Sequence, residues 1–156
     1  MTSNPMPAFA ALAAVSALVL GGCSVREIGE GEYSFRADEI LRDDCGMLAD
    51  GDALWDGRLR VSGEIVWLDY ALFGMELAGQ YKSDGSGFLV DGSAGNVDAQ
   101  VEGGTCRFES VTVGVDAEIA SPSQFGGSLR LRSTAGVDPR CTCELWTRFT
   151  AERKGT

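Results

Sequence analysis

The sequence of 156 residues contains no histidine, and it carries only 13 lysines and arginines against 23 aspartates and glutamates. Serine–histidine triads, cysteine–histidine dyads and histidine-ligated zinc are excluded, because no other side chain titrates unperturbed near neutral pH or coordinates metals so readily. The formal net charge of −10 excludes nucleic acid as a natural partner, since phosphates attract basic surfaces. Internal repeats and low-complexity segments are absent as well.

Residue constellations typical of catalysis are also missing. Asp43 and Asp44 are paired carboxylates, but adjacency along an extended chain places them on opposite sides. The segment Gly85-Ser86-Gly87 has neither the spacing of a nucleophile elbow nor an imidazole to act as a base. We therefore expect no enzyme activity and no cofactor.

The amino-terminal residues are typical of an export signal. Ala8 to Leu20 is an uncharged apolar run that is too short to span a bilayer but has the length of a signal-peptide core. It leads into Leu20-Gly21-Gly22-Cys23-Ser24, which resembles the lipobox of bacterial lipoproteins. The alternative is a buried apolar helix with an incidental cysteine, and residues 1–7 lack the basic side chains that export signals ordinarily carry.

The resemblance to lipoproteins implies a processing route and an address. In that family the cysteine thiol, here that of Cys23, takes a diacylglycerol, the chain is cut before it, and the new amine is often acylated as well, with palmitate among the chains. Two or three acyl chains give stable membrane anchoring. Ser24 after the cysteine implies the bacterial outer membrane. We expect three segments, namely a signal peptide (1–22), a lipidated tether (23–31) and a single domain (32–153).

The remaining cysteines are Cys45, Cys106, Cys141 and Cys143, an even number in an exported chain. They predict two disulfides, because export reaches an oxidising compartment. A strand through Cys141 and Cys143 would project both from one face, where a direct bridge would be strained. We expect each to pair with Cys45 or Cys106. A metal or redox site is the alternative, but zinc-ligand spacing is lacking.

Beyond the tether, apolar residues recur at every second position, which predicts strands with one wet side. The alternating runs are Tyr33–Phe35, Leu59–Trp67, Phe73–Tyr81, Phe88–Val90, Val97–Val101, Val111–Ile119, Leu129–Leu131 and Cys141–Phe149. Residues typical of turns occur at 84–87, 91–93, 103–104 and 126–127. Gly103-Gly104 is the strongest candidate for a hairpin turn. Cys106 and Phe108 are out of phase with Val111, so a β-bulge is expected near Glu109 and Ser110.

These runs predict an all-β domain of about eight antiparallel strands, arranged as a small meander barrel or a barrel-like sandwich. The only helix expected is one turn around Cys45–Leu54. The architecture is loosely similar to the lipocalin-like folds of bacterial lipoproteins, although no lipocalin signature motif is present. Trp67, Phe73, Tyr81 and Phe149 are in phase with the core and are expected to fill the barrel.

Two candidate sites remain outside the core. The carboxylates of Asp50, Asp52 and Asp56 are hard oxygen ligands suited to calcium, although the order of an EF-hand is absent and Asp-Gly pairs are ordinary turns. Trp146 lies on the polar face of the last run, between Glu144 and Arg148. It is either a partner contact, a cross-strand packing residue or a partner for a stacked arginine.

The sequence thus predicts a lipid-anchored envelope protein with a non-catalytic binding or structural role. If it carries a small apolar ligand, its barrel must be hollow. The alternative is an inhibitor or docking module for a cationic protein, which the acidic surface would attract. The third hypothesis is an enzyme.

Overall fold

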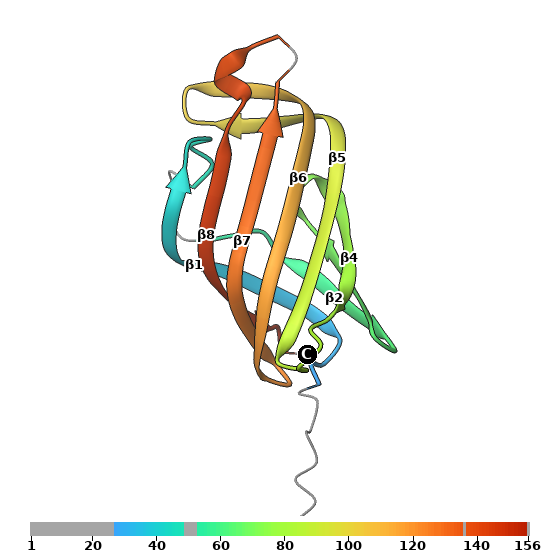
Figure 1. Cartoon of the computed structure of the whole chain (residues 1–156). Helices are drawn as coiled ribbons and strands as arrows, with labels where there is room; N and C mark the ends of the chain where they lie inside the picture. The colour runs from blue at the N-terminus through green and yellow to red at the C-terminus, as the bar shows by residue number, and fades with distance from the viewer. Residues whose placement is uncertain (1–26, 49–52, 136, 156) are drawn as a thin grey trace, which may run out of the picture.

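A computed structural model describes residues 27–48, 53–135 and 137–155. Its eight antiparallel strands form one closed ring in which each strand pairs with the next and β8 pairs with β1 (Figure 1). The predicted all-β meander barrel is confirmed. The strands are β1 (Gly31–Asp43), β2 (Gly57–Ser62), β3 (Ile65–Tyr70), β4 (Met75–Tyr81), β5 (Gly87–Val101), β6 (Gly104–Ser121), β7 (Gln124–Thr134) and β8 (Glu144–Arg153).

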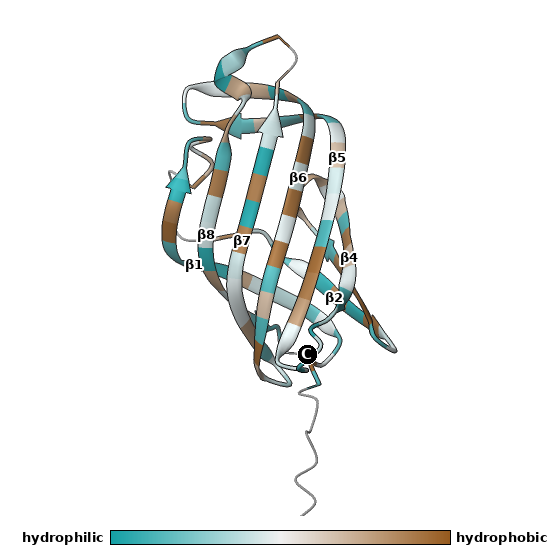
Figure 2. Cartoon of the chain, viewed as in Figure 1, coloured by the Kyte–Doolittle hydropathy of each residue, from teal (hydrophilic) through white to brown (hydrophobic). Residues whose placement is uncertain are grey.

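The inside of the barrel is filled by side chains. Apolar and polar residues alternate along the strands (Figure 2), and the inward set includes Phe125, whose ring lies 5.0 to 6.0 Å from the rings of four other aromatic residues. A void large enough for water would leave accessible area on the side chains around it, yet twelve large inward residues are less than 2% exposed. Those residues are Tyr33, Tyr70, Phe88, Phe108, Phe125, Phe149, Leu59, Leu68, Leu77, Ile119, Leu129 and Leu131.

The predicted single strand from Leu59 to Trp67 is wrong. The structure has two strands, β2 and β3, joined by a tight turn at Gly63, whose φ of +61° suits a residue without a side chain. The turn reverses the inward face, so that Val66 and Leu68 are buried. Trp67 instead lies on the outer face, and the Arg60 guanidinium lies over it, 5.8 Å from the centre of the Trp67 ring.

Two further core predictions need correction. Phe73 is half-buried in a short 3₁₀ turn, η1 (Leu72–Gly74), and not on a strand. Tyr81 is half-buried at the end of β4, because the barrel ends there. Phe149 is buried as predicted. In the stretch predicted to form a helical turn, the described residues form turns and a β-bridge between Arg36 and Ala53.

Strands β5 and β6 form one long hairpin, so the expected turn at 91–93 is wrong, as is the one at 126–127, which lies within β7. The turns at 84–87 and 103–104 are confirmed. On β6 the alternation of inward and outward residues is interrupted at Glu109 and Ser110, as the sequence indicates. The expected β-bulge is not there, because the register between β5 and β6 does not shift. Both strands change phase together, because Asn96, opposite Glu109, adopts a positive φ of 55°.

Beyond that change of phase, the tip of the β5–β6 hairpin turns across one end of the barrel (Figure 1). We call residues 97–108 the cap. The cap contacts all three other connections at this end, through the Glu102 N–H to the Gly46 carbonyl (3.1 Å), the Phe108 ring against Phe73, and the Cys106–Cys141 disulfide. The cap therefore closes this end.

Both predicted disulfides are present at the capped end. Cys45 binds Cys143 and Cys106 binds Cys141, with Cα–Cα distances of 5.1 and 5.4 Å. Cys141 and Cys143 each pair with Cys45 or Cys106, as expected. They do not lie on one strand, however, because Cys141 belongs to a second 3₁₀ turn, η2 (Pro139–Cys141), and β8 begins after Cys143.

Candidate functional site

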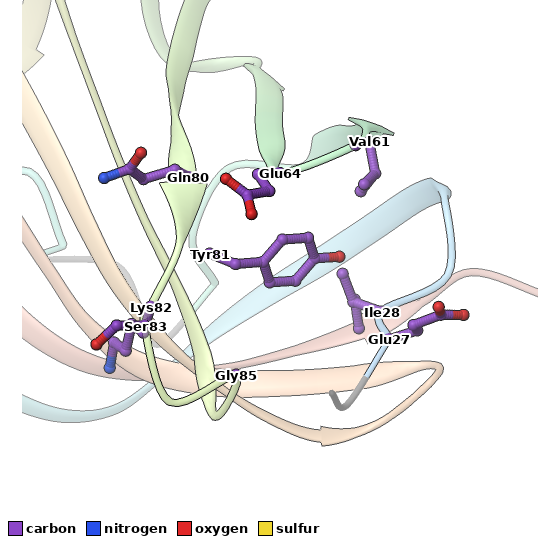
Figure 3. Close-up of a pocket in the computed structure, with 10 residues that line it drawn as sticks. Glu27, Ile28, Val61, Glu64, Gln80, Tyr81, Lys82, Ser83 and Gly85 are labelled. Carbon is purple, nitrogen blue, oxygen red and sulfur yellow. The ribbon is translucent and has the colours of Figure 1, made fainter. Parts of the chain in front are cut away.

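Among the concave surfaces outside the filled interior, two have the largest volumes. The first, which we call the base hollow, is at the end opposite the cap and has a volume of about 770 Å³. It lies between residues 27–28, the β2–β3 hairpin and the β4–β5 turn (Figure 3). The Tyr81 side chain points across it toward Ile28 and Val61, which give the hollow an apolar wall.

The rim of the base hollow is acidic. Glu27 and Glu64 line it, and among the described residues Lys82 is its single lining cation. The Lys82 ammonium is engaged by Asp116 on β6 at 2.7 Å and also by Glu118. Burial raises the pKa of Tyr81, a backbone hydrogen bond at Ile28 partly offsets this, and the charges of Glu27 and Glu30 add to it. The hollow therefore favours positive charge.

The second surface lies on the outer side of strands β5 to β8 and β1, around Trp146. We call the hollow over its β5, β6 and β7 part the outer trough. It measures about 370 Å³, and its lining residues are Asp91, Gly92, Ser93, Thr112, Val113, Gly114, Arg130 and Arg132. Strand pairing sets out one row across the sheet, in the order Asp91, Gly114, Arg130, Trp146, Arg42.

Three arginines next to Trp146 meet at one carboxylate. Arg42 donates to Glu144 at 3.1 Å, Arg132 donates at 3.2 Å, and Arg130 donates as well. The Arg130 hydrogen bond, opposed by desolvation and assisted by Arg132, holds the pKa of Glu144 below its usual value. A nearby fourth arginine, Arg148, pairs with Glu39.

Trp146 itself is 40% exposed, and the Arg130 guanidinium lies 5.3 Å from its ring centre. The stacked arginine that the sequence left open as an alternative is therefore present. The stacking leaves part of the ring accessible, so it does not remove Trp146 from consideration as a contact residue.

The other candidate residues do not come together as a site. Cys23, Asp50 and Asp52 lie outside the described residues, and the Asp56 carboxylate binds the Lys154 ammonium at 2.5 Å. Asp43 accepts hydrogen bonds from the N–H groups of Met47 and Leu48. Within the described ranges, no three histidine, cysteine, aspartate or glutamate side chains are placed to hold a metal ion.

No protein-family model, curated protein or solved structure matches this chain. No helix in the described part of the chain is long and apolar enough to cross a membrane. The function must therefore be argued from the geometry of the barrel.

Sequence reasoning missed the convergence on Glu144. The signal was the alternation in Arg130-Leu131-Arg132 and Glu144-Leu145-Trp146, which puts these polar residues on outer faces. Their proximity depends on the β7–β8 and β8–β1 registers, which alternation alone does not specify.

Proposed function

We propose that this chain is a lipid-anchored, non-catalytic binding module of the bacterial cell envelope that recognises its ligand on its outer surface. The observation that carries the proposal is the filled interior, in which fully buried aromatic rings occupy the barrel and the cap covers one end. Up-and-down barrels that carry ligands need an internal cavity. The concave surfaces described above lie outside it.

Two disulfides and the amino-terminal sequence support the proposed location. Disulfides form and persist in compartments outside the cytosol. The described chain begins at the base, with Glu27, which is four residues after Cys23. Four residues span at most about 14 Å, so acyl chains on Cys23 would hold the base near the membrane and the cap away from it.

The first experiment tests anchoring. The full chain and its Cys23→Ser variant are expressed in a bacterial host fed an alkyne analogue of palmitate. We expect label and membrane fractionation for the wild type and loss of both for the variant. Equal labelling of the two proteins would contradict the lipid anchor.

The second experiment tests whether the barrel interior can hold a ligand. A long-chain fatty acid is titrated into the full chain while tryptophan fluorescence is recorded. We expect no stoichiometric binding, because the interior offers no space. Saturation at one fatty acid per chain would contradict the proposal and restore a carrier function.

A second candidate function is docking of a cationic protein at the base hollow. In its favour, none of the ion pairs among the described residues involves Glu27, Glu30 or Glu64, and the Tyr81 ring lies beside them. A basic peptide should bind less tightly at raised salt and to a Glu27→Gln/Glu64→Gln variant. Salt-independent binding, or no loss in the variant, would contradict this function.

A further inference from the structure

The outer trough presents a sequence of chemical groups that suits one class of ligand. At one end is the carboxylate of Asp91, which forms no ion pair within the described residues. The hydroxyls of Ser93 and Thr112 lie along it, and the guanidinium groups of Arg130 and Arg132 stand at the other end. The trough thus offers hydrogen-bond acceptors and donors over its length and positive charge at one end only.

The floor of the trough leaves room for a flat ligand. A Cβ built on Gly114 would meet no atom within 4 Å, so the space above this residue is open. Gly114 pairs with Asp91 on one side and with Arg130 on the other, and Trp146 is the next residue in the same row. A volume of about 370 Å³ lies within the range of pockets that hold small organic groups.

The arginines beside the trough are incompletely neutralised. Arg42, Arg130 and Arg132 share the carboxylate of Glu144, and Arg42 has one more partner in Asp44. Three guanidinium groups therefore face two carboxylates. The Arg130 and Arg132 side chains are 45% and 59% exposed and keep donors available, while the Glu144 side chain is only 14% exposed.

We propose that the outer trough binds an acidic saccharide chain, with its carboxylate or phosphate on Arg130 and Arg132, its hydroxyls on Asp91, Ser93 and Thr112, and a sugar ring against Trp146. This inference rests on the proposed function, because it names the ligand class that the outer surface recognises. Guanidinium groups bind carboxylate and phosphate in a bidentate way.

An acidic peptide fits the trough less well than a saccharide. Most peptide docking sites hold anchoring side chains of the peptide in well-packed pockets. The lining of the trough consists of glycine, hydroxyl, carboxylate and guanidinium groups, and its one apolar member, Val113, is buried with its side chain in the core. Asp91 would repel a simple polyanion but accepts hydrogen bonds from sugar hydroxyls.

The test uses the full chain, purified with its anchor in neutral detergent, and polygalacturonate as the probe, titrated by calorimetry in 0.1 M salt. At this ionic strength charges beyond about 10 Å are screened, so the overall charge of −10 does not mask a local site. We expect saturable binding that weakens at least tenfold in 0.5 M salt, and none to neutral dextran. Absence of binding, or equal binding of dextran, would overturn the proposal.

The first variants locate the site. Arg130→Gln/Arg132→Gln should weaken binding at least tenfold. The matched control Arg58→Gln/Arg107→Gln removes two exposed arginines elsewhere on the barrel and should change binding less than twofold. Equal losses in the two double variants would show attraction without a site and overturn the proposal.

Glu144→Gln provides a readout that a structural role would not give. Removing this carboxylate releases Arg130 and Arg132 to the ligand, so we expect binding to tighten severalfold. Weaker binding would show that Glu144 positions the arginines only and would overturn the shared-arginine argument. Thermal unfolding of each variant verifies that the barrel is retained.

Two further comparisons identify the ligand class. Asp91→Ala should weaken binding, because it removes an acceptor for hydroxyls, whereas tighter binding would indicate a simple anion site and overturn the saccharide assignment. Polyglutamate should bind at least tenfold less tightly than polygalacturonate. Equal affinity would assign the trough to acidic proteins instead, and the anchoring and filled interior of the proposed function would stand unaffected.

Discussion

The two ends of the barrel are held together by different interactions. At the capped end, the β5–β6 hairpin and two disulfides join four connections. At the base, the chain ends are held by hydrogen bonds, including Gly29 N–H to the Pro122 carbonyl at 2.8 Å and Lys154 N–H to the Glu32 carbonyl at 2.8 Å. Covalent crosslinks persist through local opening, whereas backbone hydrogen bonds exposed to water open readily.

This difference indicates that the capped end is more rigid than the base. If the base lies near the membrane, the crosslinked end projects away from it, where proteases and partners have access. Under the proposed anchoring, the lipid and the membrane surface would restrict the base, which would then need less covalent reinforcement. We therefore expect exchange of backbone amides with solvent to be faster at residues 27–31 than in the cap.

The largest effect should come from removing the disulfides. Cys45–Cys143 closes a separation of 98 residues and Cys106–Cys141 one of 35. The chain-entropy model assigns about 4 kcal/mol or more to loops of this length, so each pairwise Cys→Ser variant should lose about that much free energy of unfolding. Urea unfolding measures this loss.

Cys23→Ser is the control for the disulfide variants, since this cysteine precedes the barrel in the sequence and is the proposed site of the anchor. It should leave the free energy of unfolding unchanged. A cost below about 1 kcal/mol for either disulfide variant would show that the cap is held by packing alone, and the contrast between the two ends would be lost.

The next largest effect should come from the aromatic core toward the base. Phe125 lies against the rings of Tyr33, Phe35, Phe88 and Phe149, at centroid distances of 5.0 to 6.0 Å. Phe125→Ala removes these contacts and leaves a cavity, which should cost about 3 to 5 kcal/mol. Phe125→Leu, which retains most of the volume, should cost much less.

The Phe125→Ala variant also tests the filled interior directly. The new cavity is lined by aromatic and apolar groups, so it should remain dry and bind benzene, which the wild type should not. Benzene raising the melting temperature of both proteins equally would show that the wild-type barrel already contains a cavity.

Much of the fold follows from alternation in the sequence, because a filled barrel has an apolar side chain at most of its inward positions. Alternation gives a wrong prediction where a glycine in a turn occupies the place in the pattern at which an inward residue is expected. Gly63 continues the apolar phase of Leu59 and Val61, although it forms a turn, and this error placed Trp67 in the core. A tight turn at a glycine with a positive φ does not change the alternation of apolar and polar residues, so the pattern does not reveal it.

The disulfides and the outer trough differ in how far they can be predicted. The Cys-x-Cys spacing disfavours one of three pairings from local geometry alone. The trough requires knowledge of the registers that bring Asp91, Gly114, Arg130 and Trp146 into one row across four strands. These residues are far apart in sequence, and each is unremarkable on its own strand.

A smaller effect is expected at Asn96, which directly precedes the cap and which we call its hinge. Asn96 adopts a φ of 55°, which costs most L-residues about 1 to 2 kcal/mol, while asparagine and glycine tolerate it. Asn96→Ala should therefore lower the free energy of unfolding by about 1 kcal/mol, and Asn96→Gly should change it by only a few tenths. Equal costs in the two variants, measured by urea unfolding, would mean that the Asn96 side chain, and not its backbone, holds the hinge.

The smallest effects come from two buried tyrosines with different hydrogen bonding. The Tyr33 hydroxyl donates to the Gly29 carbonyl at 2.6 Å and so ties the amino-terminal segment to the base. The Tyr70 hydroxyl is buried without a protein hydrogen bond of good geometry. Tyr33→Phe should lose about 1 kcal/mol, whereas Tyr70→Phe should be neutral or slightly stabilising.

Alkaline pH separates the two tyrosines further, since burial raises the pKa of Tyr70 well above its usual 10.0. Below pH 10 the phenol is protonated in both the folded and the unfolded chain, and its contribution to stability is complete. Above pH 10 the unfolded chain releases the proton first, so the free energy of unfolding falls by about 1.4 kcal/mol per pH unit for this group. Between pH 10 and 11 the group is still partly protonated in the unfolded chain, so Tyr70→Phe should lose less stability than the wild type by about 1 kcal/mol. Parallel losses would mean that Tyr70 ionises within the folded barrel and that water reaches this part of the interior.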